Sequence, residues 1–418
     1  MNLSELDQRL IWHPFTQMAE WQPLVIASGD GCFLVDEQGR RYLDGVSSLW
    51  CNVHGHRHPR LDRALRAQAD KLAHSTFLGL THEPGIRLAE QLLAVVPRSL
   101  SRVFYSDSGS ASVEIALKQS FQYWQLRGRP AKQRFLRLTD AYHGDTLGAV
   151  GVGGIELFHR IFGPLLVQSI PIPSPAGTDG AASLARLEQE LERRAYEIAA
   201  FVLEPLVQGA AGMLVHPPGF LRAAAELCRR YHVHLIADEV ATGFGRTGRL
   251  FACEHEDVQP DFMCLAKGIS GGYLPLAATL ASEEIYEAFL GRRVEMKHFF
   301  HGHTYTANPL ACAVGVESLA LLRESTLPSA QALEPALAAA LDRIRAVAGV
   351  REVRRRGWMV GIEVEARAAD VCARARRHGV ILRPLGEVVV WMPPLVLQQT
   401  ELDLLEQATT AAIRETLS

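Results

Sequence analysis

The chain has 418 residues, a length that predicts two domains with ample hydrophobic core. Its 43 Lys and Arg residues nearly balance 46 Asp and Glu residues, so no net field favours nucleic acid or an anionic membrane as a partner. Scattered Cys residues without a CxxC pair, an amino terminus without an apolar h-region and the lack of a bilayer-length apolar run predict a cytoplasmic protein with reduced thiols.

The first segment of the chain mixes loop and strand signals. Pro14 breaks the segment around Trp12, and residues 32–36 and 41–44 are expected to form two strands around a turn. His54, His56 and His58 alternate, which is one pattern of metal ligands. No carboxylate stands at a ligand spacing and a proline follows at once, so we expect no metal there.

Residues 60–98 show helical spacing of apolar residues, and 102–106 form a short apolar run typical of a buried strand. This strand leads into the small residues 107–112, where Ser110 is expected to cap a helix that continues to Trp124. Small residues at a helix amino terminus leave backbone N–H groups open to a phosphate. An ordinary helix cap is the alternative interpretation.

Strands and helices alternate between residues 100 and 270. Further strands are expected at 134–138 and 199–203, and helices at 182–197 and 219–231. This alternation is typical of a wound, mostly parallel sheet. Tyr142 follows one of these strands, where an aromatic ring can stack on a planar cofactor or simply fill the core.

Two apolar strands end on charged residues in the middle of the chain. Residues 235–237 lead to Asp238, and residues 262–266 lead to Lys267. Parallel strands would bring both side chains to the sheet edge at which ligands bind in α/β proteins. Burial favours the neutral amine of Lys267, and Asp238 could hold a pyridinium nitrogen, so the pair predicts a pyridoxal phosphate (PLP) site. A structural Asp–Lys ion pair is the alternative.

The remainder of the chain predicts a smaller α+β domain. Residues 274–280 follow Lys267 too closely for a crossover helix and are expected to run antiparallel, and Pro309 opens a long helix at 310–322. We predict the amino-terminal part of the small domain at 1–56, a large PLP-binding domain at 57–310 and the carboxy-terminal part of the small domain at 311–418. Dinucleotide, Walker A, HExxH and GxSxG motifs are missing from the sequence.

Several motifs together resemble the class III, PLP-dependent aminotransferases of fold type I. The stretch from Asp238 to Gly248, Lys267-Gly268 and Gly302-His303-Thr304 carry this resemblance, which covers nearly the whole chain. It implies an α/β fold with a mostly parallel seven-stranded sheet and a smaller α+β domain. It also implies an enzyme that acts on small-molecule substrates as a homodimer with shared active sites.

The resemblance assigns cofactor roles to particular residues. It makes Lys267 the Schiff-base lysine and proton shuttle, and places Asp238 at the pyridine nitrogen with His143 in the same site. It assigns binding of the cofactor phosphate to Gly109 and Ser110.

It also implies roles for a second group. His303 and Thr304 would reach the phosphate bound by the partner subunit, and Tyr142 would contact both ring and substrate. The remaining substrate-binding residues that it implies are Trp50, Arg246, Gly302 and Arg383, of which Arg383 would bind a carboxylate.

Within the class, the chain resembles the 8-amino-7-oxononanoate aminotransferases of biotin biosynthesis. This closer resemblance is carried by Trp12-His13-Pro14, residues 107–110, 122–124, 142–145 and 251–255, and Arg383-Pro384. Members that use S-adenosylmethionine as amino donor have two consecutive Trp where this chain has Leu49-Trp50, and Tyr where it has Phe15. The amino donor implied is therefore S-adenosylmethionine or lysine.

The sequence leaves two alternatives to this interpretation. One is an ω-amino-acid or diamine aminotransferase of the same class. The other is a metal-dependent hydrolase that uses His298, His301 and His303, which is disfavoured because no acidic residue accompanies these histidines.

Overall fold

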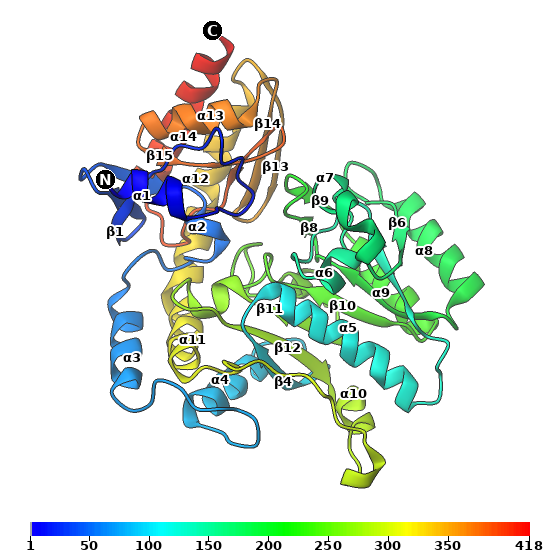
Figure 1. Ribbon diagram of the computed structural model, residues 1–418. Coiled ribbons are helices and arrows are strands. Elements are labelled where there is room, and N and C mark those ends of the chain that lie inside the picture. Colours follow the sequence, from blue (N-terminus) through cyan, green and yellow to red (C-terminus); the bar gives the residue numbers. More distant parts are fainter. Residues whose placement is uncertain (1) are drawn as a thin grey trace.

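A seven-stranded sheet forms the centre of the computed structural model, which describes residues 2–418 (Figure 1). Its strand order is β4-β12-β11-β10-β7-β5-β6. Only β12 runs antiparallel to its neighbours, which confirms the predicted mostly parallel sheet and the predicted antiparallel strand. The strands are β4 (Leu100–Ser106), β5 (Arg134–Leu138), β6 (Ser169–Ile172), β7 (Ile198–Leu203), β10 (His234–Asp238), β11 (Phe262–Leu265) and β12 (Ala277–Ser282).

The central strands are apolar and fully enclosed because helices cover both faces of the sheet. Every residue of β7, β10 and β11 is buried, as expected for parallel strands with covered faces. The helices of this part are α5 (Gly109–Leu126), α6 (Leu147–Gly151), α7 (Glu156–His159), α8 (Ala181–Arg194), α9 (Phe220–Arg230) and α10 (Glu283–Ala288). A short ribbon of β8 (Val207–Gln208) and β9 (Leu214–Val215) follows β7.

Two expectations about helices need correction. Residues 60–98 form two helices, α3 (Pro59–Ala69) and α4 (Glu83–Leu93), because His82 caps a new helix by accepting a hydrogen bond from Gly85 N. The cap of α5 is Ser108 and not Ser110, since Ser108 has an extended backbone and its hydroxyl accepts from Ala111 N. The Ser110 hydroxyl instead accepts from Thr146 N.

The two ends of the chain come together in a second part of the molecule. The amino-terminal strand β3 pairs in parallel with β15, so Leu43 lies beside Val380. A four-stranded antiparallel sheet of order β13-β14-β17-β16 lies in the same part. The elements are α1 (Leu3–Leu10), β1 (Ile26–Asp30), β2 (Phe33–Asp36), β3 (Arg41–Asp44), α2 (Ser47–Trp50), α12 (Leu327–Arg345), β13 (Val350–Arg356), β14 (Met359–Val364), α13 (Ala368–Arg377), β15 (Val380–Ile381), β16 (Arg383–Leu385), β17 (Val388–Trp391) and α14 (Gln399–Leu417).

A long helical column connects the two parts. Helix α11 (Pro309–Leu321) packs on α3 and α4 and continues through a π-helical turn, Leu322–Thr326, into α12. Figure 1 shows this column in yellow, reaching from the lower part to the upper one. None of the helices within residues 2–418 has the length and apolarity needed to cross a bilayer. The predicted domain limits stay a prediction.

Candidate active site

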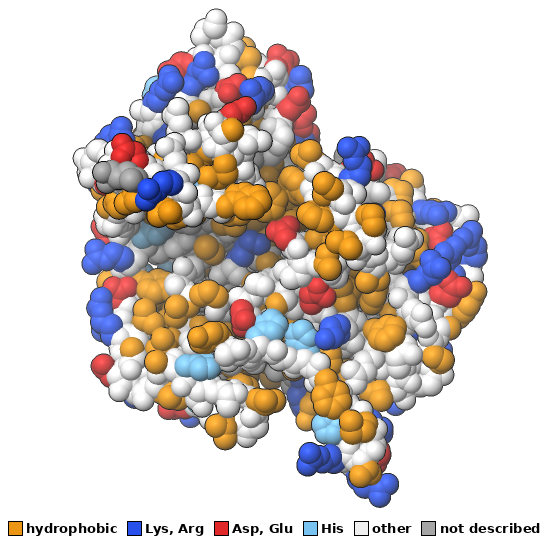
Figure 2. Space-filling model, viewed as in Figure 1, with side chains coloured by type: hydrophobic (Ala, Val, Ile, Leu, Met, Phe, Trp, Pro, Cys, Tyr) orange, Lys and Arg blue, Asp and Glu red, His pale blue; other side chains and the backbone are white. Residues whose placement is uncertain are grey.

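A cavity of about 730 Å³ opens at the carboxyl edge of the central sheet. Consecutive strands deliver its polar side chains: Glu204 follows β7, Asp238 ends β10 and Lys267 follows β11. The loop after β5 adds Tyr142 and His143. The face in Figure 2 is hollowed between the two parts of the molecule, with hydrophobic side chains on both sides of the hollow. The predicted meeting of Asp238 and Lys267 at one sheet edge is therefore present.

Lys267 is held in an unusual state. Its backbone φ of 47° lies in the left-handed region, which a non-glycine residue adopts only under constraint from its surroundings. Its amine makes no hydrogen bond or ion pair with any other residue among 2–418, and lies 5.4 Å from the centre of the Trp50 ring. Burial lowers the pKa of Lys267, while Asp238 and Glu204 oppose this shift. The side chain is thus a desolvated, uncommitted amine.

Asp238 forms a hydrogen bond with a histidine and makes no contact of this kind with Lys267. His143 Nδ1 donates to Asp238 Oδ2 at 2.7 Å, and both side chains are almost fully buried. Val240 N donates to the second carboxylate oxygen at 3.0 Å. The alternative of a structural Asp–Lys ion pair is therefore wrong. Within residues 2–418, His143 Nε2 is enclosed without a partner.

The start of α5 forms a cradle with the loop after β5. A Cβ atom on Gly109 would lie 2.6 Å from Val240 Cγ1, and one on Gly144 would lie 2.4 Å from Ser110 Cβ. Gly144 also has a φ of 113°, which L side chains rarely adopt. Only glycine fits at these two positions, and both residues line the cavity. The helix amino terminus and the missing side chains suit a phosphate group, so the site fits PLP.

Tyr142 stands over the same cavity and is tied to a carboxylate. Its hydroxyl donates to Asp145 Oδ2 at 2.7 Å. Burial and this hydrogen bond raise the pKa of Tyr142, and Arg383 is near enough to lower it in part. The Phe158 ring contacts Tyr142 edge-on, and Phe15 contacts Phe158, so aromatic rings extend the cavity wall toward the amino terminus.

Glu204 is a site residue that our sequence analysis missed. Burial raises its pKa to about 7, with His143 opposing and Asp238 adding to the shift. Its carboxylate accepts hydrogen bonds from Gly209 N and Tyr142 N at 2.9 and 3.2 Å. The signal was the one that identified Asp238, namely an acid directly after a buried parallel strand.

Arg246 does not line the cavity, which differs from the role that the resemblance implied. Its guanidinium is buried behind Trp50 and donates to Trp50 O, Ser47 Oγ and Pro393 O at 3.3, 2.9 and 2.6 Å. These acceptors belong to the protein itself, and of the three residues only Trp50 lines the cavity, so the substrate contact of Arg246 stays a prediction. Trp50 itself lines the cavity as predicted.

Arg383 is the opposite case, a charged group left free. It begins β16, is half-buried, and within residues 2–418 its guanidinium makes no hydrogen bond or ion pair. Its effect on the Tyr142 pKa places it near the cavity. A free guanidinium at this position suits a substrate carboxylate.

The loop before α11 carries a chain of hydrogen bonds that limits the role of His303. Lys118 Nζ donates to His301, His301 donates to His303 at 3.2 Å, and His303 donates to Asp107 at 3.0 Å. Both ring nitrogens of His303 are thus engaged within the chain. Thr304 beside it is exposed, its hydroxyl has no hydrogen-bond partner among residues 2–418, and Gly302 is exposed as well. Only Thr304 of the two predicted phosphate ligands therefore offers a free side chain.

The histidines of this loop do not form the arrangement that a metal site needs. In the described part of the chain, no three or more His, Cys, Asp or Glu side chains are grouped to hold a metal ion. His54 and His56 are likewise engaged, with Thr326 and Asp44 respectively.

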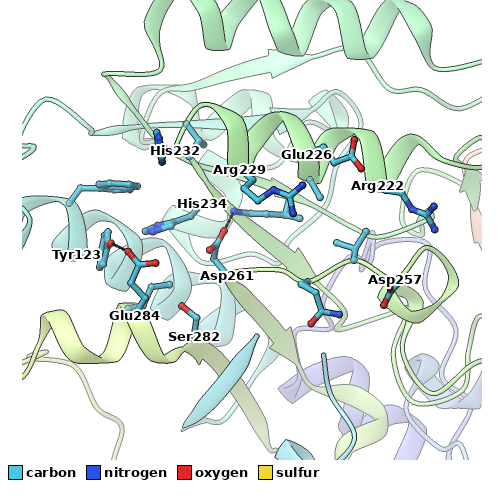
Figure 3. A pocket seen from close by; sticks show the side chains of 17 residues that line it. Tyr123, Arg222, Glu226, Arg229, His232, His234, Asp257, Asp261, Ser282 and Glu284 are labelled. Carbon is cyan, nitrogen blue, oxygen red and sulfur yellow. Dashed lines mark hydrogen bonds between the residues drawn. The ribbon is translucent and has the colours of Figure 1, made fainter. Parts of the chain in front are cut away.

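A second cavity, of about 500 Å³, lies at the opposite edge of the sheet, where His234 and Leu235 begin β10 (Figure 3). Two of its four acids accept hydrogen bonds from protein groups: Tyr123 donates to Glu284 at 2.6 Å and Leu235 N donates to Asp261 at 2.8 Å. Burial raises the pKa of Asp261 to about 6. None of the predicted site residues lies there.

Comparisons with known proteins agree with the geometry. The family model described as aminotransferase class-III matches residues 16–413. Adenosylmethionine-8-amino-7-oxononanoate aminotransferases from Geobacter sulfurreducens and Aquifex aeolicus are 49% and 44% identical, over 96% and 99% of this chain and 95% and 97% of theirs.

Solved structures extend the likeness to the fold. The crystal structure of the enzyme of that name from Methanocaldococcus jannaschii superposes with a TM-score of 0.96 at 40% identity, over 99% of each chain. A PLP-bound amine transaminase from an uncultivated Pseudomonas species gives 0.91 at 35% identity, over 97% of this chain and 99% of that one. The chain therefore belongs to the class III aminotransferases, the PLP-dependent enzymes whose fold and cofactor site it shares.

Proposed function

We propose that this protein converts 8-amino-7-oxononanoate to 7,8-diaminononanoate in biotin biosynthesis, with S-adenosylmethionine or lysine as amino donor. The observation that carries the reaction class is Lys267, a desolvated amine without a hydrogen-bond partner beside Asp238. The substrate assignment is supported by the relatives named adenosylmethionine-8-amino-7-oxononanoate aminotransferase, which are 44–49% identical to this chain.

Each residue of the site would have a separate role in such a reaction. When bound, PLP supplies an aldehyde that takes up the amino group and a ring that accepts the electrons of the broken C–H bond. Burial favours the neutral form of the Lys267 amine, which lets it bond to a carbonyl and then move a proton. Asp238, fixed by His143, would hold a proton on the pyridine nitrogen. Gly109, Ser110 and the amino terminus of α5 would hold the phosphate.

The substrate has a carboxylate at the far end of an apolar chain, and the site offers matching groups. Arg383 would pair with the carboxylate, since no protein group occupies its guanidinium. Leu49, Trp50 and Tyr142 line the cavity and would contact the methylene chain. Arg246 would hold Trp50 in place through the hydrogen bond to Trp50 O.

We also propose that the active unit is a cytoplasmic homodimer in which one protomer completes the site of the other. Support comes from the exposed Thr304 and Tyr305 on the loop before α11, and from exposed apolar side chains such as Trp12, which is 88% exposed in the single chain. Sedimentation equilibrium would test this proposal, and a monomer with full activity would contradict it.

An ω-amino-acid or diamine aminotransferase is the second candidate. The ω transaminase from Pseudomonas jessenii superposes with a TM-score of 0.94 over 100% of this chain and 98% of that one, but at only 30% identity. The much higher identity to the biotin-pathway relatives favours the first candidate.

A donor screen with the cofactor-loaded enzyme tests the proposal. The near-visible absorption of the bound cofactor is followed in single turnover with each donor, and 8-amino-7-oxononanoate is then added as acceptor. We expect lysine to react, because Leu49 and Phe15 leave an apolar pocket with one π surface and one hydroxyl fewer than two Trp and a Tyr would give. A reaction with S-adenosylmethionine but not with lysine would contradict the expectation that lysine is a donor. Failure to aminate 8-amino-7-oxononanoate would contradict the function.

A further inference from the structure

The turn that carries Trp50 into the cavity has a strained backbone. Ser47, Ser48 and Trp50 have φ values of 48°, 59° and 68°, in the left-handed region that favours glycine. Ser48 combines this φ with a ψ of −76°, outside the usual left-handed helical region. Such a conformation persists only where surrounding contacts hold it in place, and it is often found at functional sites.

A buried carboxylate holds the turn on one side. Asp44, the last residue of β3, is fully buried. Its two carboxylate oxygens accept from Ser48 N at 2.8 and 2.7 Å, and one of them also accepts from Ser48 Oγ at 3.1 Å. His56 Nε2 donates to the same carboxylate at 2.9 Å and so fixes its position.

A buried guanidinium holds the turn on the other side. Arg246 donates to Ser47 Oγ and to Trp50 O, the first and last residues of the turn. The Trp50 ring has little room to move, because a Cβ atom on Gly209 would lie 3.3 Å from it. The indole face is thereby set at 5.4 Å from the Lys267 amine.

We propose that Asp44 is a positioning residue for the amino donor. By fixing Ser48 it sets the place of Trp50 relative to Lys267, and this determines which donors present their C–H bond to the Lys267 amine. The inference rests on the proposed function, because it concerns donor selection at that site. A displacement of about 1 Å at a residue that aligns reacting groups costs on the order of 10²-fold in rate.

The test is Asp44→Asn in the cofactor-loaded enzyme. The amide keeps the size of the side chain but replaces one of the two acceptor oxygens with a donor, which then faces the Ser48 N–H from which both oxygens accept. We expect kcat/KM for the amino donor to fall about 10²-fold. We expect a smaller change in the KM for the carboxylate acceptor, since Arg383 still pairs with its carboxylate although its methylene chain also contacts Trp50. The visible circular dichroism of the bound cofactor should also change, because the Trp50 ring beside it moves.

Asp36→Asn is the matched control. Asp36 is also buried, and it accepts from Gln38 N and Arg40 N in the β2–β3 turn without lining the cavity. The Asp36→Asn variant should have a lower thermal midpoint, while its dichroism and its donor kcat/KM stay unchanged. Equal kinetic losses in both variants, or unchanged dichroism and donor kinetics in Asp44→Asn, would overturn the proposal.

Ser48→Gly covers the case in which Asp44→Asn does not fold. Glycine relieves the strain at Ser48 and removes the Oγ contact, so the thermal midpoint should rise while donor kcat/KM falls about tenfold or more. A rise in both the thermal midpoint and the donor kcat/KM would overturn the proposal. The dichroism comparison does not depend on the acceptor, so it stands even if 8-amino-7-oxononanoate is not the substrate.

Discussion

Two lysines lie at opposite edges of one sheet, Lys132 fully buried and Lys267 half-buried in the cavity wall, and their surroundings differ. At the amino edge, Lys132 Nζ donates to the carbonyl oxygens of Ala195, Ile198 and His232 at 2.7, 2.8 and 2.8 Å. It also lies 4.4 Å from the centre of the Trp124 ring. At the carboxyl edge, Lys267 has no hydrogen-bond partner among residues 2–418.

The difference separates a structural ammonium from a reactive amine. Lys132 uses all three of its protons on carbonyl groups, so its charge joins the end of α8 to the strands beside it. Burial lowers the pKa of both side chains, that of Lys132 to about 8, so the pKa does not separate them. What separates them is that the Lys267 amine has no acceptor among residues 2–418. Lys132, whose ammonium group makes all its hydrogen bonds, therefore has a structural role. Lys267, whose amine makes none within the described residues, is available to react with a substrate or cofactor.

The largest expected effect comes from Lys267→Ala. Activity should fall by about 10⁴-fold or more, the range seen when a covalent catalyst is removed. Stability of the cofactor-free protein should be kept or increased, since an unpartnered amine is removed. Steady-state rates and urea unfolding would check both. Near-normal turnover would show that the comparison of the two lysines is mistaken.

Asp238→Asn should lower kcat by about 10³-fold, because an amide cannot hold the charge of a protonated pyridine nitrogen. Cofactor binding should largely survive through the phosphate cradle. Cofactor titration and kcat measured on the same preparation would separate these effects. Wild-type kcat in this variant would contradict the role of Asp238.

Arg383→Ala extends the comparison to a second free charge at the carboxyl edge. It should weaken binding of the carboxylate-bearing acceptor by about 2–5 kcal/mol, typical of a charge pair left half-made. The half-reaction with a donor that lacks an equivalent carboxylate should suffer less. Equal losses in both half-reactions would mean that Arg383 is structural.

Lys132→Met should have the reverse profile of Lys267→Ala. The free energy of unfolding should fall by about 2–4 kcal/mol, because three buried carbonyl groups lose their donor while a buried charge is removed. The kcat should stay near wild type. Lys71→Met, at an exposed lysine, is the control for loss of charge alone. A Lys132→Met enzyme that is stable but inactive would overturn the distinction.

The smallest effect concerns pH at the amino edge. Burial lowers the pKa of His234 to about 3, so the native state holds it neutral. Between pH 6.5 and 3 the unfolded chain takes up this proton and the native state does not, so stability falls as pH falls. At pH 5 this difference in proton uptake lowers the free energy of unfolding by about 2 kcal/mol. His234→Gln should flatten the stability–pH curve between pH 5 and 6.5, and an unchanged slope would contradict the shift.

The sequence predicted the sheet well because its signals are local. Apolar runs ending on Asp238 and Lys267, and a strand too close to its predecessor to cross over, correspond to β10, β11 and β12. It erred where alternatives are decided by single hydrogen bonds. Ser108 and Ser110 both suit a helix cap, and the contact of Ser110 with Thr146 becomes visible only when the loop after β5 is in place.

The sequence by itself determined the family, the parallel sheet and the edge at which the charged residues meet, because strand order and motif spacing are written along the chain. The tertiary structure alone decided which charges are free. Both terminal nitrogens of Arg246, implied as a substrate ligand, donate to protein oxygens behind Trp50, whereas those of Arg383 have no partner among residues 2–418. Glu204 gains its pKa of about 7 from burial by distant segments. Partners and desolvation are properties of packing, and no local pattern encodes them.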